Sequence, residues 1–298
     1  MGIKSVLKGL YETKYKAVLL VTLLLIPAAF GILLYSKATT GEYFQKGVSL
    51  KGGDTYTIPV DQYVPVESLQ DRLSSRLPNA DLTVRGISEF GRLTGITIEV
   101  ADATEEEVIS SLRAEGIRIE DGSYSKESIG ASLGASFFQQ LTIAIIFAFL
   151  FMAIVVFITF RSLLPSMFVI LAVFSTILQA LAVTSLIGIK LSTAGIAAFL
   201  MLIGYSVDTD ILLTTRVLRR KEGAVMDRVY SALKTGITMT LTALVTVTLA
   251  YFLTDSEVIK QIMLILTIGL VFDLINTWVQ NVGIIRWYLE RKERARNG

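Results

Sequence analysis

The stretch FQQLTIAIIFAFLFMAIVVFITF, Phe138–Phe160, contains no charged residue and is apolar along most of its length. As an α-helix, a run of this length crosses the roughly 30 Å hydrocarbon core of a bilayer. A helix is the structure that suits it, because backbone groups in lipid must form their hydrogen bonds within the segment. The sequence therefore predicts a membrane-spanning helix here.

Five further apolar runs have the same character. They are Ala17–Tyr35, Pro165–Ile189, Ser192–Thr214, Thr235–Leu253 and Ile259–Trp287. The first run is longer than the apolar part of a usual signal peptide and five spans follow it, so we interpret it as a retained anchor. The last run exceeds one span, so we expect its end at the membrane interface, with Trp278 and Trp287 as anchors.

The composition of the 298-residue chain agrees with a membrane protein. It is 52% hydrophobic with a mean hydropathy of +0.60, whereas a soluble domain needs more charge on its surface. The net charge of +2 gives no indication of a nucleic-acid partner. With no Cys and no His, the chain lacks disulfides, thiolate metal ligands and the usual neutral-pH titrating group. No phosphate-loop, nucleophilic-serine or metal-binding motif occurs, so we expect no enzyme activity, cofactor or metal.

Lys and Arg gather in alternate short loops. One set comprises the N-terminus, Arg161, the segment Arg216–Lys234 and the tail from Arg286, whereas the opposite short loops carry only Lys190 and Lys260. The positive-inside rule then predicts a plasma-membrane protein with both termini cytoplasmic. We divide the chain into residues 1–36 (N-terminus and first helix), 37–133 (external domain), 134–288 (five-helix bundle) and 289–298 (basic cytoplasmic tail).

The insert 37–133 reads as an α+β domain. We expect strands at Asp54–Val60, Asp81–Ser88, Leu93–Val100 and Ile117–Asp121, with helices over Val66–Leu77 and from Thr104 onward. Three acidic residues after Thr104 suit the first turn of a helix. The order β-α-β-β-α-β is that of a ferredoxin-like sandwich. The predicted fold class is therefore a polytopic protein of six transmembrane helices with one external ferredoxin-like domain.

The fourth span carries two carboxylates, Asp208 and Asp210, inside an apolar helix. They lie about 200° apart around the helix, so they cannot share one face. Asp208 is about 24 Å along the helix from Ser192, in the cytoplasmic half of the bilayer. One interpretation is that both are solvated near the interface, close to Arg216. The other is a proton relay formed by Asp208, Asp210 and Arg216, because intramembrane carboxylates are costly and usually functional.

The fifth span has a line of hydroxyl groups on one helical face. Its members are Thr235, Thr238, Thr242 and Thr246. They are candidates for lining a proton or ion path, but Thr hydroxyls can also bond to carbonyls of their own helix. Both interpretations remain open.

The sixth span adds Asp273, Asn276 and Gln280 on one face, followed by Asn281. Asp273 and Asn276 are further candidates for a polar lining. The alternative is a cluster of hydrogen bonds that fixes helix packing, a role that we also expect for Gln179 in the third span.

Three segments together resemble the SecF family of archaeal type, within the SecD/SecF group and the RND superfamily. They are Gly47–Thr55 (GVSLKGGDT), Ser128–Gly134 (SIGASLG) and Gly204–Arg216 (GYSVDTDILLTTR). With six spans and one insert after the first span, the similarity extends over essentially the whole chain.

The resemblance implies an accessory subunit of the Sec protein translocase, assisting export across the plasma membrane and coupled to the proton gradient. The implied partners are a SecD-like subunit, the Sec translocation channel, the translocating polypeptide and the lipid bilayer, with no nucleic acid. The resemblance implies that carboxylates of the fourth span carry protons with the help of a nearby Arg. Asp208 stands at the position of the fourth-span Asp of SecD proteins, and Arg216 stands at the position of the family Arg. The usual SecF Asp falls on Thr209, and Ser49 stands where Asp is usual.

Two other functions fit the same topology. One is a half-size RND-like exporter of lipids or small molecules, and the other is a non-transporting scaffold for membrane-protein assembly. The presence of a SecD-like partner would favour protein export over the exporter of lipids or small molecules. The scaffold hypothesis predicts that Asp208 and Asp210 both tolerate replacement by Asn.

Overall fold

The computed structural model describes residues 14–60, 64–89, 92–119, 123–219 and 224–297. Among these residues, six helices are long and apolar enough to cross a membrane, which confirms the predicted spans. They are α2 (Tyr15–Thr40), α6 (Ala131–Phe160), α7 (Leu163–Leu186), α8 (Thr193–Leu218), α9 (Val225–Leu253) and a composite of α10 (Glu257–Ile275), the π-helix η2 (Asn276–Asn281) and α11 (Val282–Asn297).

Several helices continue beyond the apolar runs that predict them. α9 begins at Val225 instead of Thr235, and α8 reaches Leu218, so much of the segment expected as a loop is helical. Hydropathy marks where a helix crosses lipid, whereas the helix itself can extend into water. At the other boundary, α2 continues to Thr40 and α6 starts at Ala131, about one turn inside each end of the expected domain 37–133. The four-part division of the chain remains a prediction.

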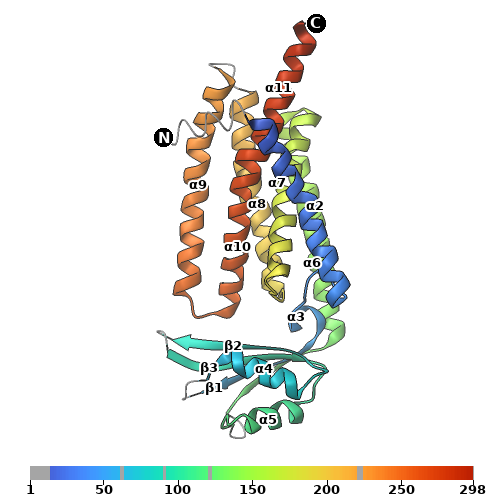
Figure 1. Ribbon diagram of the computed structural model, residues 1–298, viewed down its shortest axis with the longest axis vertical. Helices are drawn as coiled ribbons and strands as arrows, with labels where there is room; N and C mark the ends of the chain where they lie inside the picture. Colours follow the sequence, from blue (N-terminus) through green and yellow to red (C-terminus); the bar gives the residue numbers. More distant parts are fainter. Residues whose placement is uncertain (1–13, 61–63, 90–91, 120–122, 220–223, 298) are drawn as a thin grey trace.

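The bundle is centred on α7, α8 and α10, with α2, α6 and α9 around them (Figure 1). Large apolar side chains are exposed on the outer helices, as on a surface that faces lipid. Small residues allow close crossings inside. A Cβ at Gly269 would lie 2.2 Å from the Leu202 side chain, so α8 and α10 approach more closely than a larger residue permits.

The sheet domain lies at the end of the bundle where α7 joins α8 and α9 joins α10, whereas α2 begins and α11 ends at the opposite end (Figure 1). Its elements are α3 (Val48–Lys51), β1 (Gly53–Pro59), α4 (Val66–Arg76), β2 (Asp81–Glu89), β3 (Arg92–Ala101), α5 (Glu105–Ala114) and β4 (Ser125–Ile129). The strand order is β2-β3-β1-β4 with antiparallel neighbours, as in a ferredoxin-like domain.

The prediction of the last strand was wrong. Ile117–Ile119 forms no strand, and residues 120–121 of that prediction lie outside the described residues. Ile117 and Ile119 are instead buried in the domain core, so their apolar character reflects packing and not strand pairing. The fourth strand of the sheet is instead β4, which pairs with the edge of β1 opposite β3 and has mostly exposed side chains.

Two helices of the sheet domain, α4 and α5, pack on one face of the sheet. Tyr56, Ile58, Ile96 and Ile98 alternate along β1 and β3 into this core, and Leu112 joins them from α5. α5 begins as the sequence predicts. The Thr104 hydroxyl accepts from the Glu107 backbone N–H, and the Glu107 carboxylate accepts from the Thr104 backbone N–H, a reciprocal capping box.

Candidate functional site

The two carboxylates of α8 have opposite surroundings. Asp208 is exposed on the outside of the bundle. Asp210 is completely buried, and its Oδ1 accepts a hydrogen bond of 2.7 Å from Asn281 Nδ2 of η2. The two side chains therefore point to different sides of α8, as their separation of about 200° around the helix predicts. Asp210 therefore lies in the interior of the bundle, and Asp208 lies on its outer surface.

A second buried carboxylate, Asp273 of α10, lies close to Asp210. The Ser206 hydroxyl donates to Asp273 Oδ1, and Thr209 Oγ1 lies 3.2 Å from Asp273 Oδ2. Thr277 Oγ1 lies 3.5 Å from Oδ1. Hydroxyl groups of α8 thus contact both oxygens of Asp273 and join α8 to α10.

The π-helix η2 presents amide side chains to both α7 and α8. Asn276 Nδ2 donates to Thr176 Oγ1 and to Gln179 Oε1, each at 2.9 Å. Gln280 Nε2 donates to Ser175 Oγ at 3.1 Å. π-helical turns within α-helices occur frequently at functional sites.

These contacts form one buried cluster that we call the polar core. It consists of Ser175, Thr176, Gln179, Ser206, Thr209, Asp210, Asp273, Asn276, Thr277, Gln280 and Asn281. Of the candidates proposed from sequence, the structure brings Asp210, Asp273 and Asn276 together here. The expected packing bonds of Gln179 and Asn281 are present as well.

The other sequence candidates lie outside the polar core. Arg216 Nη1 donates to the Ser231 carbonyl at 2.7 Å and to Thr235 Oγ1 at 2.9 Å, so it ties α8 to α9. Three more threonines of the predicted face are exposed and bond to carbonyls of their own helix. These are Thr238, Thr242 and Thr246. These threonines therefore fit the interpretation in which the hydroxyls bond to carbonyls of their own helix, and they do not line the interior of the bundle.

The sequence reasoning missed the hydroxyl groups of the polar core. Ser175 and Gln179 are four residues apart in the third span and therefore on one face of α7. That spacing is a signal for a polar partner on another helix. Ser206 and Thr214 have the same spacing, four residues before and after Asp210, and therefore share its face of α8.

A second set of polar contacts joins the sheet domain to the bundle. Lys190, in the α7–α8 connection, bonds to the Asp81 carboxylate and donates to the Leu82 carbonyl at 3.0 Å. Asp81 is also paired with Lys51. Burial lowers the pKa of Lys190, because it disfavours the charged form of the amine.

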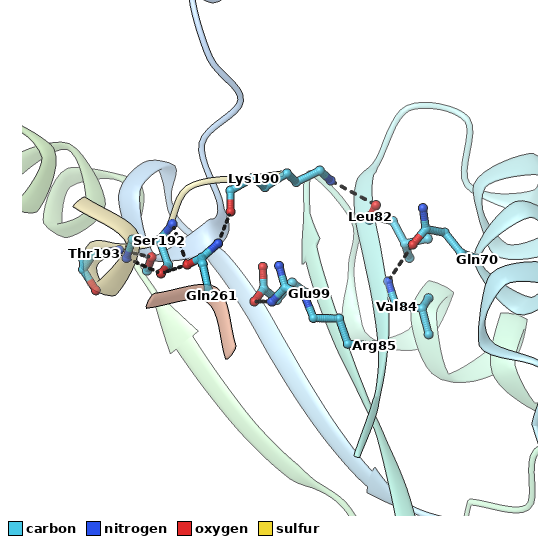
Figure 2. A network of polar contacts seen from close by, with 11 residues as sticks. Gln70, Leu82, Val84, Arg85, Glu99, Lys190, Ser192, Thr193 and Gln261 are labelled. Carbon is cyan, nitrogen blue, oxygen red and sulfur yellow. Dashed lines mark hydrogen bonds and ion pairs between the residues drawn. The ribbon is translucent and has the colours of Figure 1, made fainter. Parts of the chain in front are cut away.

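Gln261 of α10 completes this junction, as Figure 2 shows. Its Nε2 donates to the Lys190 carbonyl at 2.7 Å, and its Oε1 accepts from the Ser192 backbone N–H at 3.3 Å. Nearby, Ser49 Oγ accepts from the Thr193 backbone N–H at 3.1 Å. The start of α8 is therefore held by both α10 and α3.

Beside the junction lies a cleft of about 430 Å³ between the sheet and the end of the bundle. Arg85 of β2 lines it, paired with Glu99 of β3 at 2.5 Å. From the bundle, Tyr251, Glu257 and Lys260 line the opposite side. Glu257 and Lys260 pair with each other, whereas Arg85 and Lys190 each pair with a carboxylate of the sheet domain.

Residues 111–291 match the family model described as the C-terminal region of the protein export membrane proteins SecD and SecF. The protein-export membrane protein SecF of Methanothermobacter thermautotrophicus is 38% identical over 273 residues, which cover 90% of this chain and 92% of that one. The chain belongs to the SecF family. A second SecF-family relative, from Pyrococcus furiosus, is 36% identical and covers 98% of this chain and 97% of its own.

The fold agrees with a solved structure that contains a SecF-like part. The crystal structure of SecDF, a translocon-associated membrane protein from Thermus, superposes with a TM-score of 0.72 at 19% identity. The match covers 92% of this chain but 38% of the SecDF chain. At this low identity the likeness establishes the fold alone, and the chain spans less than half of that protein.

Two of the segments that resemble the SecF family meet in the structure. Gly134, near the start of α6, lies against the backbone of α3 and Gly52, where a Cβ would be 2.6 Å from Gly52 N. Gly52 has φ of +92°, a conformation that favours glycine. These glycines allow the entry and exit of the sheet domain to lie side by side.

Proposed function

We propose that this chain is an accessory subunit of the Sec protein translocase, which assists protein export together with a SecD-like partner. The observation that carries this proposal is the match to SecF relatives along nearly the full length of both chains. The SecDF neighbour supports the partner, because a SecF-like fold occupies 38% of that single chain and leaves room for a SecD-like part.

The exposed face of α8 is our candidate contact with the partner. Met201, Gly204, Tyr205 and Asp208 lie one or two turns apart on this face and are exposed. A carboxylate within a span costs roughly 2.5 to 3.5 kcal/mol against lipid, so a protein surface with polar groups is a better neighbour for Asp208. We assign the SecD-like subunit to this position.

Proton coupling is proposed for Asp208 within that contact. A carboxylate between two subunits is shielded from lipid and can exchange a proton as the subunits move. Arg216 does not bond to Asp208 in the structure, so its place in such a relay requires a rearrangement of its contacts to α9.

The proposed orientation places both termini in the cytoplasm and the sheet domain outside. Its support is that the sheet domain lies at the end of the bundle that bears Lys190 and Lys260, away from the more basic end (Figure 1). Because the chain has no Cys, single cysteines at Ser74 and at Lys292 can test this with a membrane-impermeant thiol reagent. Labelling of position 74 alone from outside is expected, and labelling of position 292 alone would reverse the orientation.

Membership of the translocase is tested by purifying the tagged chain from native membranes in mild detergent and identifying its partners by mass spectrometry. Recovery of a SecD-like subunit and the translocation channel is the expected result. Recovery of lipid-transport components instead would favour the exporter of lipids or small molecules.

Coupling is tested separately with Asp208→Asn, measured as protein export in cells that carry the variant in place of the native chain. We expect export to fall at least tenfold while the protein level is unchanged. Asp255→Asn, an exposed position in the α9–α10 connection, is the matched control and is expected to export normally. Full export by Asp208→Asn would remove the coupling role and leave the translocase membership intact.

A further inference from the structure

A cleft lies at the end of the bundle away from the sheet domain, where α2 begins beside α11 (Figure 1). Its volume is about 250 Å³, and it is lined by Lys16 of α2 and by Trp287, Glu290, Arg291 and Arg294 of α11. The four residues of α11 are spaced i, i+3, i+4 and i+7, so they share one face of that helix. Two helices that are distant in sequence thus present three cations to one cleft.

The carboxylate of this cleft already has its partners. Glu290 Oε1 accepts a hydrogen bond of 3.0 Å from Arg286 Nε, and Glu290 Oε2 accepts from the Tyr15 hydroxyl. The guanidinium carbon of Arg286 also lies 4.3 Å from the centre of the Tyr15 ring. Glu290 is therefore neutralised by Arg286, a residue that does not line the cleft.

The three cations of the cleft have no such partner. Lys16, Arg291 and Arg294 form no ion pair with a residue of the described part of the chain. The guanidinium carbon of Arg291 lies 5.4 Å from the centre of the Trp287 ring, a cation–π contact that holds this side chain at the cleft. Because Arg286 balances the carboxylate, the cleft has an excess of positive charge.

Basic residues at one end of a bundle are expected from the positive-inside distribution alone, and most of them are simply solvated. Lys14 and Lys292 are of this kind, since both are exposed and neither lines the cleft. Lys16, Arg291 and Arg294 differ, because they converge from two helices on one hollow. Cations that converge without an anion indicate an anionic ligand.

The surface below the cleft indicates which anion binds. From Lys16 the exposed face of α2 continues into the span with Leu20 and Leu24, which are 60% and 56% exposed. Trp287 is 45% exposed and lies one turn before Arg291, and Trp rings favour the boundary between lipid headgroups and acyl chains. A ligand in the cleft therefore meets cations at one end and an apolar surface at the other, which suits a lipid better than a free ion.

We propose that Lys16, Arg291 and Arg294 bind the phosphate group of an anionic lipid, whose acyl chains lie along the exposed apolar face of α2. Guanidinium groups present paired N–H donors that match the oxygens of a phosphate, and the amine of Lys16 adds a third positive charge. Basic pockets between transmembrane helices can hold lipid headgroups in this way. The lipid connects the first and last spans, beside the bond between Tyr15 and Glu290.

This site is independent of the proposed function. It lies within one chain and away from Asp208, so lipid binding can be measured without a partner or an export assay. Failure of the export experiments leaves the lipid site standing, and failure of lipid binding leaves the translocase membership standing.

The test is native mass spectrometry of the full-length chain in detergent, titrated with phosphatidylglycerol and, separately, with phosphatidylcholine of the same acyl chains. We expect one phosphatidylglycerol molecule to bind about tenfold more tightly than the zwitterionic lipid. Equal affinity for the two lipids would overturn the proposal. Inorganic phosphate at constant ionic strength should not displace the bound lipid, and displacement by an equimolar amount would mean that the cleft binds free phosphate and that the lipid assignment is wrong.

Two double variants locate the lipid. Lys16→Gln combined with Arg291→Gln should lose most of the preference for phosphatidylglycerol. Lys14→Gln combined with Lys292→Gln removes two cations beside and on the same two helices but outside the cleft, and should bind like the native chain. All four side chains are exposed, so both variants should fold. Equal losses in the two double variants would mean that the lipid responds to the overall charge of this end of the bundle, and the assignment to the cleft would fall.

Discussion

Lys190 and Asp81 join the bundle to the sheet domain. Lys190 lies in the connection between α7 and α8, and Asp81 is the first residue of β2. The same amine donates to the Leu82 carbonyl, and Asp81 also pairs with Lys51, the last residue of α3. One carboxylate therefore receives cations from both parts of the molecule, and this holds the sheet domain against the end of the bundle.

Replacing Lys190 should loosen the sheet domain. In Lys190→Met the aliphatic stem remains but the bonds to Asp81 and Leu82 are lost, which should cost about 1 kcal/mol of the contact between the two parts. Spin labels on cysteines introduced at Ser74 and Asp255 would report the change, since the native chain has no Cys. We expect a broader distance distribution between the labels in Lys190→Met.

Lys260→Met is the matched control for this experiment. Lys260 pairs with Glu257 of the same helix at 3.2 Å, so its loss removes no bond between the two parts. Equal broadening in both variants would mean that the junction does not depend on Lys190.

The close approach of α6 to α3 should make Gly134 intolerant of a methyl group. A Cβ at Gly134 would lie 2.6 Å from Gly52 N and 3.0 Å from the Lys51 carbonyl carbon, and both are backbone atoms that cannot move alone. We expect Gly134→Ala to destabilise the protein by about 1–3 kcal/mol in thermal or denaturant unfolding. Gly130→Ala, where nothing lies within 4 Å, should stay close to the native stability. A native-like Gly134→Ala would contradict the packing described.

The amide of Asn276 should contribute to stability, whereas the exposed threonines should not. Asn276→Leu keeps the approximate volume but leaves Gln179 Oε1 without its donor, at a cost of about 1 kcal/mol. Thr242→Val removes an exposed hydroxyl that bonds to its own helix, and should change stability by less than about 0.5 kcal/mol. Reversible unfolding in mixed micelles measures the free energy of unfolding of both variants. A larger loss of stability in Thr242→Val than in Asn276→Leu would contradict the structural role of the Asn276 amide.

Acid should loosen α5 through its capping box. Hydrogen bonds from the backbone N–H and the hydroxyl of Thr104 lower the pKa of Glu107 below its ordinary value of 4.5. The stabilisation is complete above the unfolded pKa and is lost as the pH falls through the lower folded pKa. Hydrogen exchange of α5, corrected for intrinsic rates, should be constant from about pH 7 to pH 5 and should increase below about pH 4.

Glu107→Gln should remove part of this pH dependence, because Gln does not titrate. The side chain of Glu106, in the same turn, is exposed and forms no hydrogen bond or ion pair with a described residue, so Glu106→Gln should leave the profile as it is. If both variants keep the native profile, another group controls the acid response of α5.

The elements that the sequence predicts correctly are those with a strong local signal. Six apolar runs become six spanning helices, and Thr104 begins α5 because its side chain and the acidic first turn suit a helix start. β4 escaped prediction because Ser125–Ile129 has mostly exposed side chains and no apolar alternation. Its position depends on pairing with β1, which is distant in sequence.

The polar core shows a second limit of prediction from sequence. The spacing of Asp208 and Asp210 predicts that they diverge, but lipid and protein interior are both apolar, so hydropathy does not tell which of them faces inward. The same difficulty affects α9, where Thr240 is buried although it lies off the predicted threonine face. The π-helix adds a further obstacle, because it changes the spacing that relates Asp273 to Asn281.

The π-helix η2 also determines how α11, which follows it, is rotated about the helix axis. Each residue turns an α-helix by about 100°, so deletion of one residue between Asn276 and Asn281 would rotate α11 by that angle relative to α10. Glu290 would then turn away from the Tyr15 hydroxyl that bonds to it from α2. The length of this short segment thus sets the azimuth at which the C-terminal helix meets the first span, and insertions or deletions there are expected to be far less tolerated than substitutions.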